Sequence, residues 1–373
     1  MSDRATALAG IRVLELAGKG PGPFGVMLLA DLGADVIRVD RPGAAPSSST
    51  VDRGRRTIGI DLKHERGREL LLRLVERSDV LVEGYRPGVA ERLGFGADVC
   101  LARNPRLVFA RMTGWGQDGP LAERAAHDLN YLAVAGGLHP LGDADRPPPP
   151  PLNLVGDYGG GGTFLALGVL AALFERERSG LGQVVDAAMV DGVASLLTVY
   201  HDLLAHGAWT DDREANVVDG GAPWYRCYRT ADGRFVAVAT LEPPFYALLL
   251  EKLGLDPDEW PMADRARWPR LREELEAIFG SRTRDDWEDL FAGSDACVTP
   301  VHTLAEARES PHLVARGTFV ARNGTAVPAP APRLSRTPAE LAPPAANDSD
   351  RILAEAGVDP TTAAELRREK VVA

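Results

Sequence analysis

From residue 10 to about residue 200, short apolar runs alternate with stretches that suit amphipathic helices, and this alternation limits the possible folds more than any other feature. Six of the runs are rich in β-branched residues and have the length of strands: 11–16, 35–40, 57–62, 79–84, 106–114 and 183–190. Between them lie segments such as 64–78, in which apolar residues recur with helical spacing. Such an alternation is typical of βαβ units, so we predict an α/β fold with a parallel sheet and helices on both faces.

Beyond residue 220 the pattern changes. Residues 221–240 contain two β-rich runs joined by Ala231-Asp232-Gly233, which predicts a hairpin, and helical segments follow. Five consecutive prolines at 147–151 predict an extended connector, and the Pro- and Ala-rich stretch 323–348 predicts an extended arm before a short terminal helix. We therefore expect a large domain over 1–223, a small α+β domain over 224–318, and an arm and helix over 319–373.

Charge and composition exclude several classes of protein. The net charge of −11 argues against general nucleic-acid binding, which relies on surplus Lys and Arg. The three cysteines, Cys100, Cys227 and Cys297, are far apart and have no CxxC or His-spaced partner, so we expect neither a disulfide framework nor a metal site. No apolar run reaches the ~20 residues of a membrane span, and the first residues lack the pattern of a secretory signal. We expect a cytoplasmic protein.

The segment 13–40 superficially matches a dinucleotide-binding fingerprint, because a strand runs into a glycine loop and a second strand ends on Asp40. The match fails at Pro23, where the fingerprint that starts at Gly18 requires glycine. Pro21 and Pro23 also remove two backbone amides that a pyrophosphate would need. We therefore reject NAD as a ligand and interpret the loop as a tight turn between a strand and a helix.

Eight blocks of sequence, in this order, resemble the α-methylacyl-CoA racemase branch of the class III CoA-transferase (CaiB/BaiF-type) superfamily. They are AGKGPGPFGVMLLADLGADVIRVDRP, VLVEGYRPGVAERLG, ARMTGWGQDGP, AHDLNYLA, NLVGDYGGGG, GQVVDAAMVDG, DGGAPWYRCY and SDACVTPV. The resemblance spans nearly the whole chain. It implies a Rossmann-like large domain completed by the C-terminal arm, a small domain, and an interlocked homodimer.

The resemblance also implies a reaction, the epimerisation of 2-methyl-branched acyl-CoA thioesters through an enolate. Removing a proton from one face of a carbon and returning it to the other requires two proton-transfer groups that work near neutral pH. His127 and Asp157 match the paired acid and base of the racemases. CoA is part of the substrate, so no separate cofactor is expected.

Two further carboxylates match supporting positions of the family. Glu242 corresponds to a glutamate that reaches the site from the small domain, and Glu83 to one that hydrogen-bonds the histidine. A helix that opens through 159–162 would present bare amides to the enolate oxygen. The resemblance assigns that contact to the backbone amide of Asp157 as well.

A net acidic protein needs a basic cleft for the phosphates of CoA. Four basic residues match CoA-contacting positions of the family: Arg38, Lys63, Arg86 and Arg92. We expect the backbone of Ile60, Asp61, Leu62 and Lys63, and that of Gly84, Tyr85 and Arg86, to pack on the nucleotide. We expect Tyr131 to line the thioester end, and Ala126, Asp128 and Asn130 to be further substrate-binding residues. Ala126 departs from the family, which usually has glycine there.

Three alternatives remain. A CoA-transferase would use Asp157 as a nucleophile that attacks the thioester, and it would need neither His127 nor Glu242. A CoA-binding protein without catalysis would usually have lost one of the proton-transfer groups, and this chain retains all of them. A metal-dependent isomerase is disfavoured, because no residues have ligand spacing. The racemase is the favoured hypothesis, although the sequence does not identify the acyl chain.

Overall fold

The computed structural model describes residues 6–44 and 49–373, and the chain divides into two compact units. The first unit comprises Met1–Ala135, Pro151–Leu197 and Phe319–Ala373, and the second comprises Gly136–Pro150 and Thr198–Thr318. The C-terminal segment thus joins the first unit. The segments 136–150 and 198–223 group with the second unit, whereas the sequence analysis had placed them in the first.

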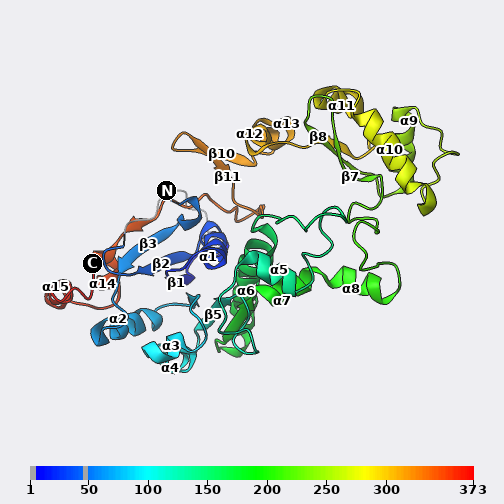
Figure 1. Ribbon diagram of the computed structural model, residues 1–373. Coiled ribbons are helices and arrows are strands. Elements are labelled where there is room, and N and C mark those ends of the chain that lie inside the picture. Colours follow the sequence, from blue (N-terminus) through cyan, green and yellow to red (C-terminus); the bar gives the residue numbers. More distant parts are fainter. Residues whose placement is uncertain (1–5, 45–48) are drawn as a thin grey trace. The chain divides into compact units, whose positions relative to one another are not determined.

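The first unit is built on a seven-stranded parallel sheet in the order β12-β3-β2-β1-β4-β5-β6. Figure 1 labels β1, β2, β3 and β5 of this sheet. Its strands are β1 (Arg12–Leu16), β2 (Asp35–Asp40), β3 (Arg55–Gly59), β4 (Val80–Glu83), β5 (Val108–Thr113), β6 (Val184–Ala188) and β12 (Ala346–Asn347). The first six are the six predicted strands, and the α/β class is confirmed. The seventh, β12, pairs with β3 and comes from the Pro- and Ala-rich arm, where the sequence carries no strand signal.

Alternate residues of the strands enter two separate cores, one on each face of the sheet. Val13, Val36 and Val80 pack with helices α1 (Pro21–Asp31) and α6 (Phe164–Ser179). Leu14, Ile37 and Leu81 pack on the other face with residues of α2 (Glu65–Val75), α4 (Ala97–Arg103), α14 (Ser349–Glu355) and α15 (Pro360–Arg368). Strands covered on both faces favour apolar residues on both of their sides, which explains the nearly continuous apolar runs.

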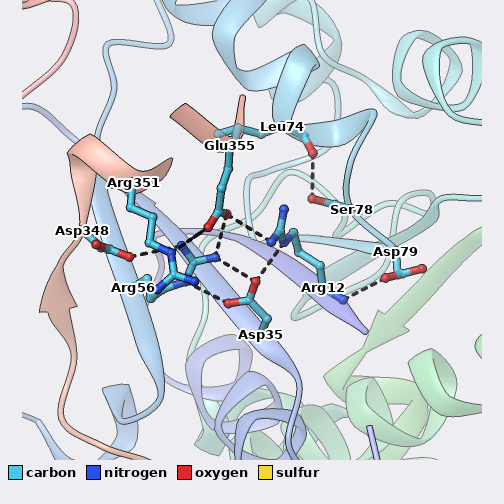
Figure 2. A network of polar contacts seen from close by, with 9 residues as sticks. All are labelled: Arg12, Asp35, Arg56, Leu74, Ser78, Asp79, Asp348, Arg351 and Glu355. Carbon is cyan, nitrogen blue, oxygen red and sulfur yellow. Dashed lines mark hydrogen bonds and ion pairs between the residues drawn. The ribbon is translucent and has the colours of Figure 1, made fainter. Parts of the chain in front are cut away.

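Ion pairs connect α14 with strands β1, β2 and β3 of the sheet (Figure 2). Arg56 on β3 contacts Asp35 on β2 at 2.8 Å, Glu355 on α14 at 3.1 Å and Asp348 at 3.2 Å. Arg12 on β1 completes the network with Asp35 at 2.9 Å and Glu355 at 3.1 Å. The carboxylates hold the pKa of Arg56 above its usual value against the opposing effect of burial. The last part of the chain is therefore held against the sheet as part of this unit.

A π-helical segment, η2 (Leu154–Thr163), runs directly into α6. Together they form one helix, Leu154–Ser179, which by length and composition alone could cross a membrane. Leu165, Val169 and Leu173 of this helix are buried in the core beneath the sheet, as in the core helix of an α/β domain. Its packing, with α1 and with α7 (Met189–Leu196) beside it, accounts for the apolar residues on its buried side.

The second unit contains the predicted hairpin. Strands β7 (Tyr225–Arg229) and β8 (Phe235–Ala239) are antiparallel, and β9 (Val298–Pro300) adds to β8. Helices α9 (Pro243–Leu253), α10 (Trp268–Phe279) and α11 (Arg284–Phe291) enclose an aromatic core with this sheet. Trp224 lies edge-on to Trp268 with ring centroids 5.0 Å apart, and Tyr228 stacks on Phe279 at 5.1 Å. Aromatic side chains thus supply much of the buried surface of a small unit.

Candidate active site

The carboxyl ends of β1 and β4 border a cleft of about 530 Å³ in the first unit. β1 has β2 on one side and β4 on the other, so the winding of the chain reverses between β1 and β4. Open α/β sheets bind ligands at such a switch point, beyond the carboxyl ends of the strands. Eight predicted site residues line the cleft: Glu83, Gly84, Tyr85, Arg86, Ala126, His127, Tyr131 and Asp157.

The glycine loop after β1 forms one wall of the cleft. Gly20, which precedes α1, has a φ of +69°, a conformation that side chains rarely adopt. A β-carbon at Gly20 would lie 3.6 Å from Oδ2 of Asp157, so the loop passes directly beside that carboxylate. Pro21 and Pro23 fall in the first turn of α1, where they remove amides as the sequence analysis states. Lys19 also lines the cleft, and the sequence analysis had not singled it out.

His127 lies immediately before α5 (Asp128–Val134), at the N-cap position. Its backbone N–H donates to Oδ1 of Asn130 at 3.1 Å, and its side chain is exposed at the cleft. Asn130 itself is absent from the cleft lining. This capping bond holds the backbone of His127, and the contact of Asn130 with substrate stays a prediction.

Asp157 lies in the first turn of η2 and is half-buried. Its Oδ2 accepts a hydrogen bond from Nδ2 of Asn153 at 3.3 Å. Burial raises the pKa of Asp157, and the nearby charge of Asp128 acts in the same direction, whereas the Asn153 bond and His127 oppose the rise. A carboxyl group whose pKa lies above its usual range is better suited to returning a proton near neutral pH.

Tyr131 packs beside these two groups. Its hydroxyl donates to the carbonyl of Ala126 at 2.8 Å, and its ring meets Trp115 edge-on with centroids 4.8 Å apart. Gly114 permits this packing, since a β-carbon there would lie 2.2 Å from the tyrosine hydroxyl. Burial raises the pKa of Tyr131, and the charge of Asp157 adds to the effect.

The amides expected to face an enolate oxygen are arranged differently from the sequence expectation. The N–H of Asp157 already donates to Oδ1 of Asp128 at 2.7 Å. The glycines 159–162 lie inside η2, and three of them are buried. Gly160 abuts the backbone of α7, and Gly162 abuts α1, with β-carbon positions 2.9 Å from the nitrogen of Val193 and 2.7 Å from the carbonyl oxygen of Pro21. The glycines therefore allow helices to pack closely, and the expectation of bare amides there is wrong.

Glu83, at the end of β4, is only 3% exposed, and its burial raises its pKa to about 7. Oε2 accepts the N–H of Tyr85 at 2.7 Å, and Oε1 lies 4.0 Å from Nε of Arg111. Among the described residues, Glu83 forms no hydrogen bond with His127, although both residues line the cleft. Glu242 precedes α9 in the second unit, while the cleft belongs to the first, so its role stays a prediction.

The other CoA candidates lie away from the cleft. Arg38 lines a smaller pocket of about 130 Å³ beyond β2 and β3, together with Arg41, and it is already paired with Asp40 at 3.0 Å and Asp52 at 2.7 Å. Ile60 is buried and pairs with Val372, and Oδ1 of Asp61 accepts the N–H of Lys63 at 2.9 Å. Leu62 is partly buried against the core that contains Ile60, and Lys63 and Arg92 are exposed.

Within residues 6–44 and 49–373, no group of three His, Cys, Asp or Glu side chains could hold a metal ion. The three cysteines are free thiols. The functional groups at this cleft, which lies at the switch point of the parallel sheet, are therefore a histidine and carboxylates.

Comparison with known proteins identifies the class. The family model of CoA-transferase family III matches residues 8–349. The chain is 44% identical over 372 residues to the alpha-methylacyl-CoA racemases of Mus musculus and Homo sapiens, covering 98% of this chain and 97% of each relative. A crystal structure of a CAIB/BAIF family protein from Brucella suis superposes with a TM-score of 0.80 at 28% identity, covering 94% of this chain and 99% of that one. The chain belongs to CoA-transferase family III.

Proposed function

We propose that this protein is a racemase that interconverts the two configurations at the α-carbon of 2-methylacyl-CoA thioesters. One observation carries the proposal. An imidazole, His127, and a carboxylate, Asp157, come from two different helical elements, line one cleft, and lie close enough for their charges to interact. The names of the mouse and human relatives support it.

The reaction needs one group to take the α-proton and a second to supply a proton to the opposite face. With one enantiomer, His127 accepts the α-proton and the electron pair of the C–H bond moves into the thioester to form an enolate. Asp157, in its protonated form, then donates a proton to the same carbon from the other side. The roles exchange for the other enantiomer. Burial and the charge of Asp128 raise the pKa of Asp157, which favours the protonated form that this step uses.

The substrate carries its own activating group, so we propose no separate cofactor. Lys19, Arg86 and Arg124 line the cleft and supply positive charge in a protein whose net charge is −11. Arg38, Lys63 and Arg92 are proposed to contact the nucleotide end of CoA.

We propose that the protein acts as a cytoplasmic homodimer. Helix α6 exposes an apolar stripe at helical spacing, in which Leu167 is 59% and Phe174 is 71% exposed, with Ala171 between them. The edge strand β6 adds the exposed Val184. Monomeric soluble proteins seldom leave such stripes uncovered. Light scattering coupled to gel filtration should give twice the mass of the 39.9 kDa chain, and a single-chain mass would contradict the dimer.

The proposal is tested by incubating the pure protein in D₂O with one enantiomer of a 2-methylacyl-CoA and no acceptor acid. We expect deuterium at the α-carbon together with loss of configuration. If no exchange occurs and CoA instead passes to an added carboxylate, the protein is a transferase and Asp157 is its nucleophile. Mass spectrometry and chiral analysis of the hydrolysed acid distinguish these outcomes.

A further inference from the structure

A buried carboxylate connects the two elements that carry the proton-transfer groups. Asp128 follows His127 directly, is the first residue of α5, and is 6% exposed. Its Oδ1 accepts the backbone N–H of Asp157 at 2.7 Å, across 29 positions of sequence. The amide of Asp157 belongs to the first turn of η2, where amides have no acceptor within their own helix. Asp128 therefore caps a helix that is not its own.

We propose that Asp128 is a positioning residue that fixes the backbone of Asp157 relative to His127. The inference rests on the proposed function, and it assigns to Asp128 a role other than substrate contact. Because His127 and Asp128 are adjacent, the bond from Asp128 to Asp157 links both proton-transfer groups through a single side chain. A proton-transfer pair must hold its geometry closely, since small displacements of reacting groups cost large factors in rate.

The carboxylate of Asp128 packs so closely on Gly156 that no side chain fits at position 156. A β-carbon at Gly156 would lie 2.5 Å from Oδ1 of Asp128 and 2.9 Å from Cδ1 of Leu132. Glycine at 156 therefore allows η2 to approach α5 closely enough for the 2.7 Å bond to form. An alanine at this position would push the two elements apart and provides a second way to disturb the same contact.

Asp128 also shapes the electrostatic surroundings of Asp157. Its Oδ2 is buried and has no hydrogen-bond partner among the described residues, so its charge is only partly compensated. Three other groups face the Asp157 carboxylate: His127 and Tyr131 at α5, and the Asn153 amide before η2. Asp128 differs from these three groups, because its negative charge disfavours the ionisation of Asp157. Different substitutions of Asp128 can therefore separate its effect on the position of Asp157 from its effect on the ionisation of Asp157.

The experiment compares Asp128→Asn, Asp128→Ala and a control, Asp98→Asn, which removes an exposed carboxylate from the first turn of α4. The side-chain oxygen of asparagine can still accept the Asp157 amide, whereas alanine cannot. For each variant, kcat and KM of racemisation are measured across pH, and folding is checked by urea titration. Gly156→Ala provides the same disturbance if Asp128→Ala fails to fold.

For Asp128→Ala we expect kcat to fall by roughly ten- to a hundredfold with KM nearly unchanged, because the geometry of the pair is lost and the cleft is not. For Asp128→Asn we expect most of kcat to remain. Its pH profile should move to lower pH on the limb due to Asp157, since a neighbouring negative charge is gone. The control should match the wild type in both respects.

Two results would overturn the inference while the proposed function stands, and a third would overturn both. If the wild type racemises and Asp128→Ala, folded, retains its kcat and pH profile, Asp128 does not position the pair. A drop in kcat equal in Asp128→Asn and Asp128→Ala, with no shift in the pH limb, would also contradict it, because the conservative variant should rescue. If the wild type itself catalyses no racemisation, the proposed function fails and the inference fails with it.

Discussion

Arg55 on β3 and Glu15 on β1 form a buried ion pair that spans the intervening strand β2. Nε of Arg55 lies 2.9 Å from Oε2 of Glu15, and Nη2 lies 3.2 Å from Oε1, with side-chain exposures of 0% and 2%. The same guanidinium donates to the carbonyl of Pro23 at 2.7 Å. Glu15 and Pro23 both line the cleft, so this pair ties the centre of the sheet to the wall beside Asp157.

Replacing Glu15 with glutamine should lower the free energy of unfolding by about 3–5 kcal/mol, because it leaves the Arg55 charge buried without its counter-ion. The matched control is Glu177→Gln, which breaks the exposed pair of Glu177 with Arg106 at 3.5 Å, where side-chain exposures are 70% and 53%. That change should cost less than about 1 kcal/mol. Urea titrations of both variants measure the difference, and equal losses would contradict the importance of burial.

The alternation of apolar runs and helices was sufficient to predict six strands and the class of fold, because strands covered on both faces have a distinctive composition. It could not predict β12, which is two residues long and exists only because β3 offers an open edge to a distant segment. The start of β3 was also misplaced. Arg55 and Arg56 lie outside the predicted run 57–62, yet both belong to β3, where their charges are paired with Glu15 and Asp35.

The crossing of η2 and α7 predicts a large difference between two glycine variants. In Gly192→Ala the new β-carbon would lie 1.9 Å from the carbonyl oxygen of Gly160, which is backbone and cannot turn aside. We expect a loss of at least about 1–3 kcal/mol of stability from overpacking. In Gly22→Ala, within α1, the nearest atom is a side-chain carbon of Met112 at 3.8 Å, and alanine favours the helix by up to ~1 kcal/mol. Thermal unfolding should rank them far apart, and similar midpoints would refute the close crossing.

Glu83 predicts a specific pH dependence of stability. Burial raises its pKa from 4.5 to about 7 in the folded protein, so between these values the folded state binds more protons than the unfolded state. Stability therefore falls as pH rises through this window. Relative to Glu83→Gln, the wild type should lose about 3 kcal/mol between pH 4.5 and 7, since one pKa unit corresponds to ~1.4 kcal/mol.

Glu355 provides a control of opposite sign. Although burial acts to raise its pKa, hydrogen bonding and charge from Arg56, with Arg12, hold that pKa below the usual value. Its contribution to stability is therefore present above the unfolded pKa and is lost as the pH falls below it. Urea titrations of wild type, Glu83→Gln and Glu355→Gln across pH should give slopes of opposite sign for the two differences. A difference between wild type and Glu83→Gln that does not vary with pH would contradict the raised pKa.

For the site, the motif resemblance was sufficient to select His127, Asp157, Glu83 and Tyr131, and the fold brings these four to one cleft. It did not show that Asp128 and Asn130 accept backbone amides, because a sequence shows which polar residues flank a histidine but not where their side chains point. The role of the glycines 159–162 was likewise hidden. Close packing of η2 on α1 and α7 depends on segments far away in the chain.

The paired arrangement of His127 and Asp157 predicts that neither group alone can racemise the substrate. In His127→Ala and in Asp157→Ala, racemisation should fall by at least about 100-fold, the usual contribution of a positioned acid or base. Affinity for CoA should stay close to that of the wild type, because most of the cleft lining is untouched. His64→Ala is the matched control, since His64 also occupies a helix N-cap, before α2, and contacts the amide of Arg66. Chiral analysis and deuterium content are measured together: the remaining group can exchange a proton on its own face without inverting the centre. Inversion at the wild-type rate in either variant would show that racemisation does not require both groups.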